Sequence, residues 1–212
     1  MKQWYAQPGD RFEVTVDGFV IDIVRDGLLL EVQTKSLASM KRKLTRLLDG
    51  HRLRVIYPIA REKWIVRLPR ADGSRPTRRK SPRRGRVEDV FWELVSIPQL
   101  IANRNFSLEV VMIREEEARR YEAKRRWRRK GWVVDERRLL EVVDRRVFEK
   151  PADWLWALPD GPGPFTSTAL AETMGISRKL AQKMAYVLRK AGVLEIVGTQ
   201  ARAHLYGVAS SG

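Results

Sequence analysis

The segment from residue 16 to residue 33 constrains the fold more than any other part of the chain. It reads Val-Asp-Gly-Phe-Val-Ile-Asp-Ile-Val-Arg-Asp-Gly-Leu-Leu-Leu-Glu-Val-Gln, so two apolar runs rich in β-branched residues flank Asp26-Gly27. An Asp-Gly pair between such runs is typical of a two-residue β-hairpin turn. The segment therefore predicts two antiparallel strands that are joined at residues 26 and 27.

Polar side chains interrupt both predicted strands. Side chains alternate across a strand, so Glu31 and Gln33 lie on the same face. On the first strand, Asp17 and Asp22 lie on opposite faces. Carboxylates from two strands can converge on one cation, and Mg²⁺ is bound by one or two carboxylates and several waters. We therefore expect Asp17 and Glu31 to hold Mg²⁺ or Mn²⁺. Gln33 is expected beside them, and Asp22 is the alternative first ligand.

The order of these features resembles a known family. An Asp, a hairpin, a Glu-x-polar motif and a basic helix at 36–49 occur in the same order in the core of the PD-(D/E)xK restriction-endonuclease-like nucleases. The resemblance covers about the first half of the chain. It implies a metal-dependent DNA endonuclease, a hydrolase of phosphodiester bonds, with Asp17 and Glu31 as the metal-binding acids and Gln33 as the third catalytic residue.

The sequence departs from the family pattern at Gln33, where most members carry Lys and a minority carry Gln. Lys35 or Lys41 could supply a displaced cation. In the family an acid near the N-terminus often completes the metal site, which makes Glu13 a secondary candidate. The departure also favours an alternative, a catalytically inactive nuclease fold that serves as a DNA-binding regulator or scaffold. An ordinary hairpin with solvated acids is the simplest alternative.

Basic residues greatly outnumber acidic residues. The chain has 42 Lys and Arg against 26 Asp and Glu, a formal net charge of +16 and an isoelectric point near 10.6. Such a charge attracts polyanions, and DNA is the expected partner. In two basic runs, at 75–86 and 124–132, the candidate DNA-binding residues are Arg78, Arg79, Lys80, Arg83, Arg84, Arg126, Trp127, Arg128 and Arg129. A solvated linker is the alternative for each run.

The periodicity predicts an α/β (α+β) fold, with a mixed sheet flanked by helices. Residues 36–48 have apolar side chains at helical spacing, and 52–59 and 63–68 are apolar enough for two further strands. Another strand is expected at 106–113. Residues 135–148 predict a second amphipathic helix. The three consecutive acids at 115–117 are expected to be solvated.

The C-terminal segment predicts a small winged helix-turn-helix domain. Helices are expected at 166–174 and 178–190, separated by a turn at Gly175, and two short strands follow with a wing at 198–202. The second helix and the wing carry the remaining candidate DNA-binding residues, Arg178, Lys179, Gln182, Lys183 and Arg202. Winged helices also serve as protein-docking modules, which is the alternative here.

Composition shifts and turn signals predict three regions. They are a nuclease-like domain at 1–115, a basic helical connector at 116–158 and the winged-helix domain at 159–212. The chain has no Cys, which excludes thiolate chemistry, and its two His are far apart in the sequence, which disfavours a His-based metal site. It has no apolar stretch of membrane-spanning length and no secretory signal, so a cytoplasmic protein is expected. Many members of the resembling family are dimers, so the resemblance is compatible with a homodimer.

Overall fold

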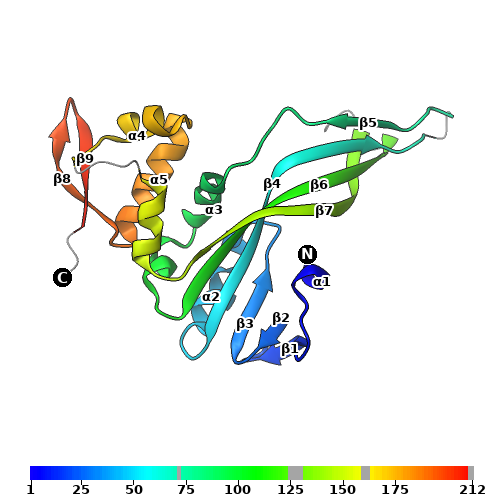
Figure 1. The fold of residues 1–212 in the computed structure, drawn as a ribbon, viewed down its shortest axis with the longest axis horizontal. Helices are drawn as coiled ribbons and strands as arrows, with labels where there is room; N and C mark the ends of the chain where they lie inside the picture. The colour runs from blue at the N-terminus through cyan, green and yellow to red at the C-terminus, as the bar shows by residue number, and fades with distance from the viewer. Residues whose placement is uncertain (71–72, 124–130, 159–162, 210–212) are drawn as a thin grey trace. The chain divides into compact units, whose positions relative to one another are not determined.

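The computed structural model describes residues 1–70, 73–123, 131–158 and 163–209. It contains a mixed seven-stranded sheet with helices, followed by C-terminal helices and a separate two-stranded hairpin (Figure 1). The predicted fold class is therefore confirmed. Contacts divide the chain into two compact units. Unit 1 comprises Met1–Tyr57, Glu88–Val110 and Arg146–Gly212, and unit 2 comprises Pro58–Val87 and Val111–Arg145.

An antiparallel meander of three strands begins the sheet. The first elements are α1 (Lys2–Tyr5), β1 (Arg11–Val16), β2 (Phe19–Arg25) and β3 (Leu28–Val32). The Asp26-Gly27 turn between β2 and β3 confirms the predicted hairpin. A second Asp-Gly turn, Asp17-Gly18, joins β1 to β2. Both residues of each turn have positive φ, between 46° and 79°, as a type I′ hairpin turn requires.

The chain then crosses over through a helix into a parallel strand. The connecting elements are η1 (Leu37–Met40) and α2 (Lys41–Leu47), and they lead to β4 (Arg52–Arg67), which runs parallel to β3. Leu44 and Leu47 of α2 are fully buried. The predicted strands at 52–59 and 63–68 are thus one continuous strand. Its second half pairs with the short strand β5 (Thr77–Lys80), as Trp64 opposite Lys80 illustrates.

Two further long strands extend the sheet, and one corrects a prediction. They are β6 (Phe106–Tyr121) and β7 (Trp132–Phe148). The helix predicted at 135–148, and with it the helical connector, is wrong because these residues form β7. Their charged side chains have partners on β6: Arg137 contacts Glu117, and Arg138 contacts Glu116. The acids at 115–117 are accordingly not solvated, since Glu117 is only 2% exposed.

Short helices connect the sheet to the C-terminal part of unit 1. They are η2 (Val87–Val90), α3 (Phe91–Leu94), η3 (Pro98–Ala102) and η6 (Pro151–Ala157). Phe148, at the end of β7, stacks on Trp154 of η6 with ring centroids 4.0 Å apart. Trp154 also meets Phe91 of α3 edge-on at 5.4 Å. This aromatic cluster joins three segments that are distant in the sequence.

The C-terminal helices and hairpin follow the predicted order. The elements are α4 (Ser167–Met174), α5 (Arg178–Lys190), β8 (Leu194–Gln200) and β9 (Ala203–Val208). Thr166 and Ser177 cap the two helices, because each side-chain oxygen accepts a hydrogen bond from a first-turn amide at 3.2 Å. Gly175 ends α4 in a left-handed conformation with φ of 60°. Helix α5 packs against α4 and β8, and also against α3 and η3. The contacts therefore group this region within unit 1.

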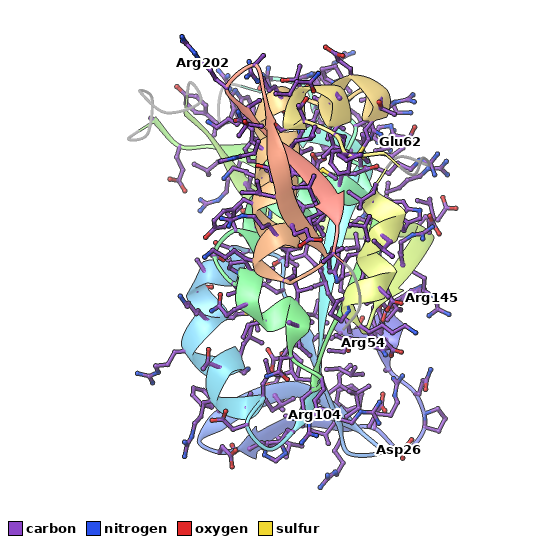
Figure 2. All side chains as sticks on the ribbon, turned by 90° about the vertical axis from the view of Figure 1, so that its left-hand side faces the viewer. Asp26, Arg54, Glu62, Arg104, Arg145 and Arg202 are labelled. Carbon is purple, nitrogen blue, oxygen red and sulfur yellow. The ribbon has the colours of Figure 1, made fainter. Side chains whose placement is uncertain are left out.

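The β8–β9 hairpin has an unusual turn. Ala201 and Arg202 occupy it, and both have positive φ, 48° and 67°. Arg202 projects at the tip of the hairpin (Figure 2). Left-handed backbone costs an L-residue other than Gly, Asn or Asp about 1–2 kcal/mol. This turn is therefore strained, in contrast to the two Asp-Gly turns.

No helix in the described parts of the chain is both long enough and apolar enough to cross a membrane.

Asp10 fixes the N-terminal segment to β2 and should make stability depend on pH. Its carboxylate accepts hydrogen bonds from Arg25 at 2.8 and 2.9 Å and from the Gln7 amide at 2.8 Å. The hydrogen bond from Arg25 is the main reason that the pKa of Asp10 falls from 3.8 to about 2. A lowered pKa means that ionised Asp10 stabilises the folded state fully above 3.8, and that this stabilisation is lost as the pH falls toward 2.

We therefore expect Asp10→Asn to lower the urea midpoint at pH 7. The difference from the wild type should shrink as the pH falls from about 4 to about 2. Urea titrations of both proteins across this range measure it. A difference that stays constant with pH would contradict the assignment of the effect to the Asp10 charge.

Candidate metal centre and nucleic-acid interface

A row of three acids crosses the meander. The pairs Phe12–Ile23 and Val14–Ile21 bracket Glu13 and Asp22, which places these two residues opposite each other on β1 and β2. In the same way, pairing of Ile23 with Leu30 places Asp22 next to Glu31 on β3. Residues that are opposite each other in antiparallel strands have their side chains on one face. Glu13, Asp22 and Glu31 therefore form one acidic row.

Asp22 and Glu31 are held together by hydrogen bonds to the backbone. The Asp22 amide donates to Glu31 Oε1 at 3.2 Å, and the Val32 amide donates to Asp22 Oδ2 at 2.9 Å. Each carboxylate thus binds the main chain of the neighbouring strand. Glu31 is 6% exposed, and the Asp22 side chain is 17% exposed. The two acids are fixed and largely withdrawn from solvent.

Two lysines neutralise the acidic row. Lys2 Nζ of α1 lies 2.7 Å from both Glu13 Oε1 and Asp22 Oδ1. Lys43 Nζ of α2 lies 2.5 Å from Glu31 Oε1. Burial raises the pKa of Glu31, an effect that the hydrogen bond from Lys43 opposes and that the nearby Asp22 reinforces. Each acid of the row therefore has an ammonium group within hydrogen-bonding distance.

Asp17 lies outside the acidic row. It occupies the β1–β2 turn, its side chain is 47% exposed, and its Oδ2 is 3.1 Å from His51 Nε2. The structure thus places Asp22, the alternative first ligand, beside Glu31. Asp17 was predicted within a strand because only Asp26-Gly27 was interpreted as a turn, whereas the segment contains two Asp-Gly turns. The second turn moves Asp17 out of the strand.

Gln33 and the candidate replacement lysines also differ from expectation. The Gln33 amide nitrogen donates to the Ser36 carbonyl at 3.2 Å and to Ser39 Oγ at 3.4 Å, so the amide faces the start of η1. Lys35 and Lys41 are exposed. The lysine that reaches Glu31 is Lys43, which sequence reasoning missed. The basic run at 41–43 is evident in the sequence, but the sequence does not show which of these side chains faces the sheet.

Asp22 and Glu31 are the two residues of the acidic row that could hold a hard divalent cation. Among the described residues, no group of three or more His, Cys, Asp or Glu side chains has metal-binding geometry. Asp22 and Glu31 alone supply two carboxylates, and Mg²⁺ commonly uses one or two and keeps several waters. The donor set therefore fits Mg²⁺ or Mn²⁺. Binding would have to compete with the ammonium groups of Lys2 and Lys43.

The predicted DNA-binding residues on α5 have two different environments. Arg178, Lys179 and Gln182 are exposed. Lys183 is half-buried, and its Nζ lies 5.3 Å from the ring centroid of Trp92 on α3. This contact is a cation–π interaction between α5 and α3. Three of the four candidates on α5 are thus available to a ligand, and Lys183 takes part in packing.

The basic run at 75–86 is also divided. Arg78 and Lys80 form ion pairs with Glu116 and Glu62. Arg84 lies 3.8 Å from Glu62 with a side chain that is 72% exposed. The other two candidates of this run, Arg79 and Arg83, are exposed. The candidates Arg126, Trp127, Arg128 and Arg129 lie outside the described residues.

Comparison with known proteins places this chain in a family. No solved structure matches it. A protein of Treponema pallidum (strain Nichols), named "Uncharacterized protein", is 31% identical over 209 residues, which cover 97% of this chain and 82% of that protein. Residues 1–149, which include the acidic row, match the model of the family described as Domain of unknown function (DUF8091). The chain therefore belongs to the DUF8091 family.

Proposed function

We propose that this protein is a Mg²⁺-dependent deoxyribonuclease whose metal ligands are Asp22 and Glu31. The observation that carries the proposal is the pairing of these two carboxylates on adjacent strands, where hydrogen bonds to the backbone fix them. The strand order gives further support. An antiparallel meander, a helix and a parallel fourth strand agree with the resemblance to the PD-(D/E)xK nucleases.

Each residue near the acidic row has a role in this proposal. Mg²⁺ bound there would lower the pKa of a bound water and offset negative charge on the scissile phosphate. Asp22 and Glu31 would hold the ion. Lys43 also donates a hydrogen bond to the Val20 carbonyl, and its ammonium group would have to leave both Glu31 and this carbonyl to bind a phosphate oxygen. It would thereby provide the cation that Gln33 cannot provide.

A second function is favoured by one observation. The Gln33 amide is bound to Ser36 and Ser39, and both acids already have lysine partners. That arrangement suits a nuclease fold that binds DNA without cutting it. Such a protein would act as a DNA-binding regulator or scaffold.

Nicking of supercoiled plasmid DNA by the purified full-length protein distinguishes the two functions. We expect nicked product with Mg²⁺ or Mn²⁺ and none with EDTA. If neither metal supports nicking while the protein still retards the plasmid in a gel, the deoxyribonuclease proposal fails and the non-cutting function replaces it.

A further inference from the structure

The positive charge of the protein is concentrated in unit 2. Its two segments contain 23 Lys and Arg against 10 Asp and Glu, a formal charge of +13, out of +16 for the whole chain. Unit 1, which contains the acidic row, has 19 Lys and Arg against 16 Asp and Glu, a formal charge of +3. A polyanion is therefore attracted mainly to unit 2.

Many cations of unit 2 already have acidic partners. Glu62 lies 2.7 Å from Lys80 and 3.2 Å from Arg114. Glu116 lies 2.8 Å from Arg78 and 2.6 Å from Arg138. The hydrogen bond from Lys80 holds the pKa of Glu62 below its usual range, and those from Arg78 and Arg138 do the same for Glu116. Arg78 and Lys80 also lie over the Trp64 ring, at 5.1 and 5.2 Å from its centroid.

Three arginines on or next to strands β4 and β5 differ from these paired cations. Within the parts of the chain that the structure describes, Arg61, Arg79 and Arg83 are exposed and form no ion pair. Arg79 is opposite Ile65 on β4, and Ile65 is four residues from Arg61, so Arg61 and Arg79 share a face. Arg83 follows Ser81, whose amide still donates to the Lys63 carbonyl and continues the strand pairing.

We propose that Arg61, Arg79 and Arg83 bind the phosphate backbone of DNA, whereas Arg78 and Lys80 stabilise the sheet edge. The inference rests on the proposed function only for the identity of the partner, and it does not require cleavage. It also assigns two different roles to residues of the basic run at 75–86, which the sequence alone does not distinguish.

The difference follows from the cost of making a phosphate contact. An exposed, unpaired guanidinium displaces condensed counterions from DNA without losing an interaction of its own. Arg78 would first have to leave Glu116, and Lys80 would have to leave Glu62, and each would expose a carboxylate next to the phosphates. The unpaired arginines therefore make the better phosphate ligands.

Two double variants of the full-length chain test the proposal. Arg79→Ala with Arg83→Ala removes two unpaired cations, and Arg78→Ala with Lys80→Ala removes two paired ones, so both variants lose the same net charge. Binding to a fluorescent DNA duplex of about 30 base pairs is measured between about 50 and 200 mM salt. Each lost phosphate contact reduces the slope of log K against log salt by about 0.9.

We expect the Arg79/Arg83 variant to lower this slope by about 1.8, which is about a tenfold loss of binding at the lowest salt relative to the highest. The slope of the Arg78/Lys80 variant should remain close to that of the wild type. Equal slopes for the two variants, or a wild type that does not bind the duplex at low salt, would overturn the proposal. Measuring all slopes in EDTA separates this result from cleavage, because no divalent cation is then present and the slopes report binding alone, whether or not the wild type cuts with Mg²⁺.

Discussion

Replacing Glu31 with Gln is expected to abolish metal-dependent nicking, with a loss of at least about 10²–10³-fold, the scale for removing one preorganised electrostatic group. Gln cannot supply the carboxylate charge that holds a divalent cation, but its oxygen can still accept the hydrogen bond from the Asp22 amide. Asp22→Asn should have the same effect. Initial rates of plasmid nicking at saturating Mg²⁺ measure both losses.

Asp17→Asn is the matched control. It removes the same charge from the same meander, but from a turn residue whose partner is His51. This variant should retain nicking within a few-fold of the wild type. Loss of nicking in Asp17→Asn, together with activity in Asp22→Asn, would return the site to the assignment made from the sequence. Thermal midpoints of all three variants establish that they are folded.

Replacing Trp154 with Ala is expected to destabilise the protein by about 3–5 kcal/mol, the usual cost of removing a large buried aromatic side chain. Trp154 is 2% exposed and contacts the rings of Phe148 and Phe91. These residues come from η6, β7 and α3, so the cavity would weaken contacts among three segments of unit 1. Because domains are typically stable by about 5–15 kcal/mol, the loss is a large share of the total.

Trp156→Ala provides the comparison. Trp156 is two residues away and 39% exposed, and its ring lies under the Arg146 guanidinium at 4.0 Å. Its removal should cost about 1 kcal/mol or less, the value of an exposed cation–π contact. Urea unfolding followed by circular dichroism measures both variants. Similar losses for Trp154→Ala and Trp156→Ala would show that the stacked cluster does not hold these segments together.

The meander was predictable because its information is local. Asp26-Gly27 between apolar runs specifies a hairpin within a few residues, and Glu31 could be placed on its face by alternation alone. Alternation alone could not decide whether Asp17 or Asp22 is the carboxylate that lies beside Glu31. Choosing between Asp17 and Asp22 requires the number of strands, and only the register places Asp22 next to Glu31. The contact between Lys43 and Glu31 could not be predicted for a related reason, because it depends on how α2 packs on the sheet.

Strand β7 was mispredicted because its apolar residues also fit a helical period. What decides the structure is non-local: Arg137 and Arg138 have their acidic partners on β6. A strand whose charges are satisfied across a sheet can override helical spacing, and a single sequence does not reveal those partners. The environment of Lys183 also depends on a distant contact. Its spacing on α5 predicts an outer face, and in the structure its half-buried ammonium group contacts Trp92 of α3.

The hairpin turns imply an order of assembly. Asp17-Gly18 and Asp26-Gly27 adopt left-handed backbone at little cost, so β1, β2 and β3 can pair early from local preferences. Ala201-Arg202 must be forced into the same geometry, and an isolated hairpin is only marginally stable. The β8–β9 hairpin should therefore form late, after α5 has folded and provided a surface for β8. Pulsed hydrogen exchange during refolding would then protect amides of the meander before those of the C-terminal hairpin, and the reverse order would show that the strained turn does not delay this part of the chain.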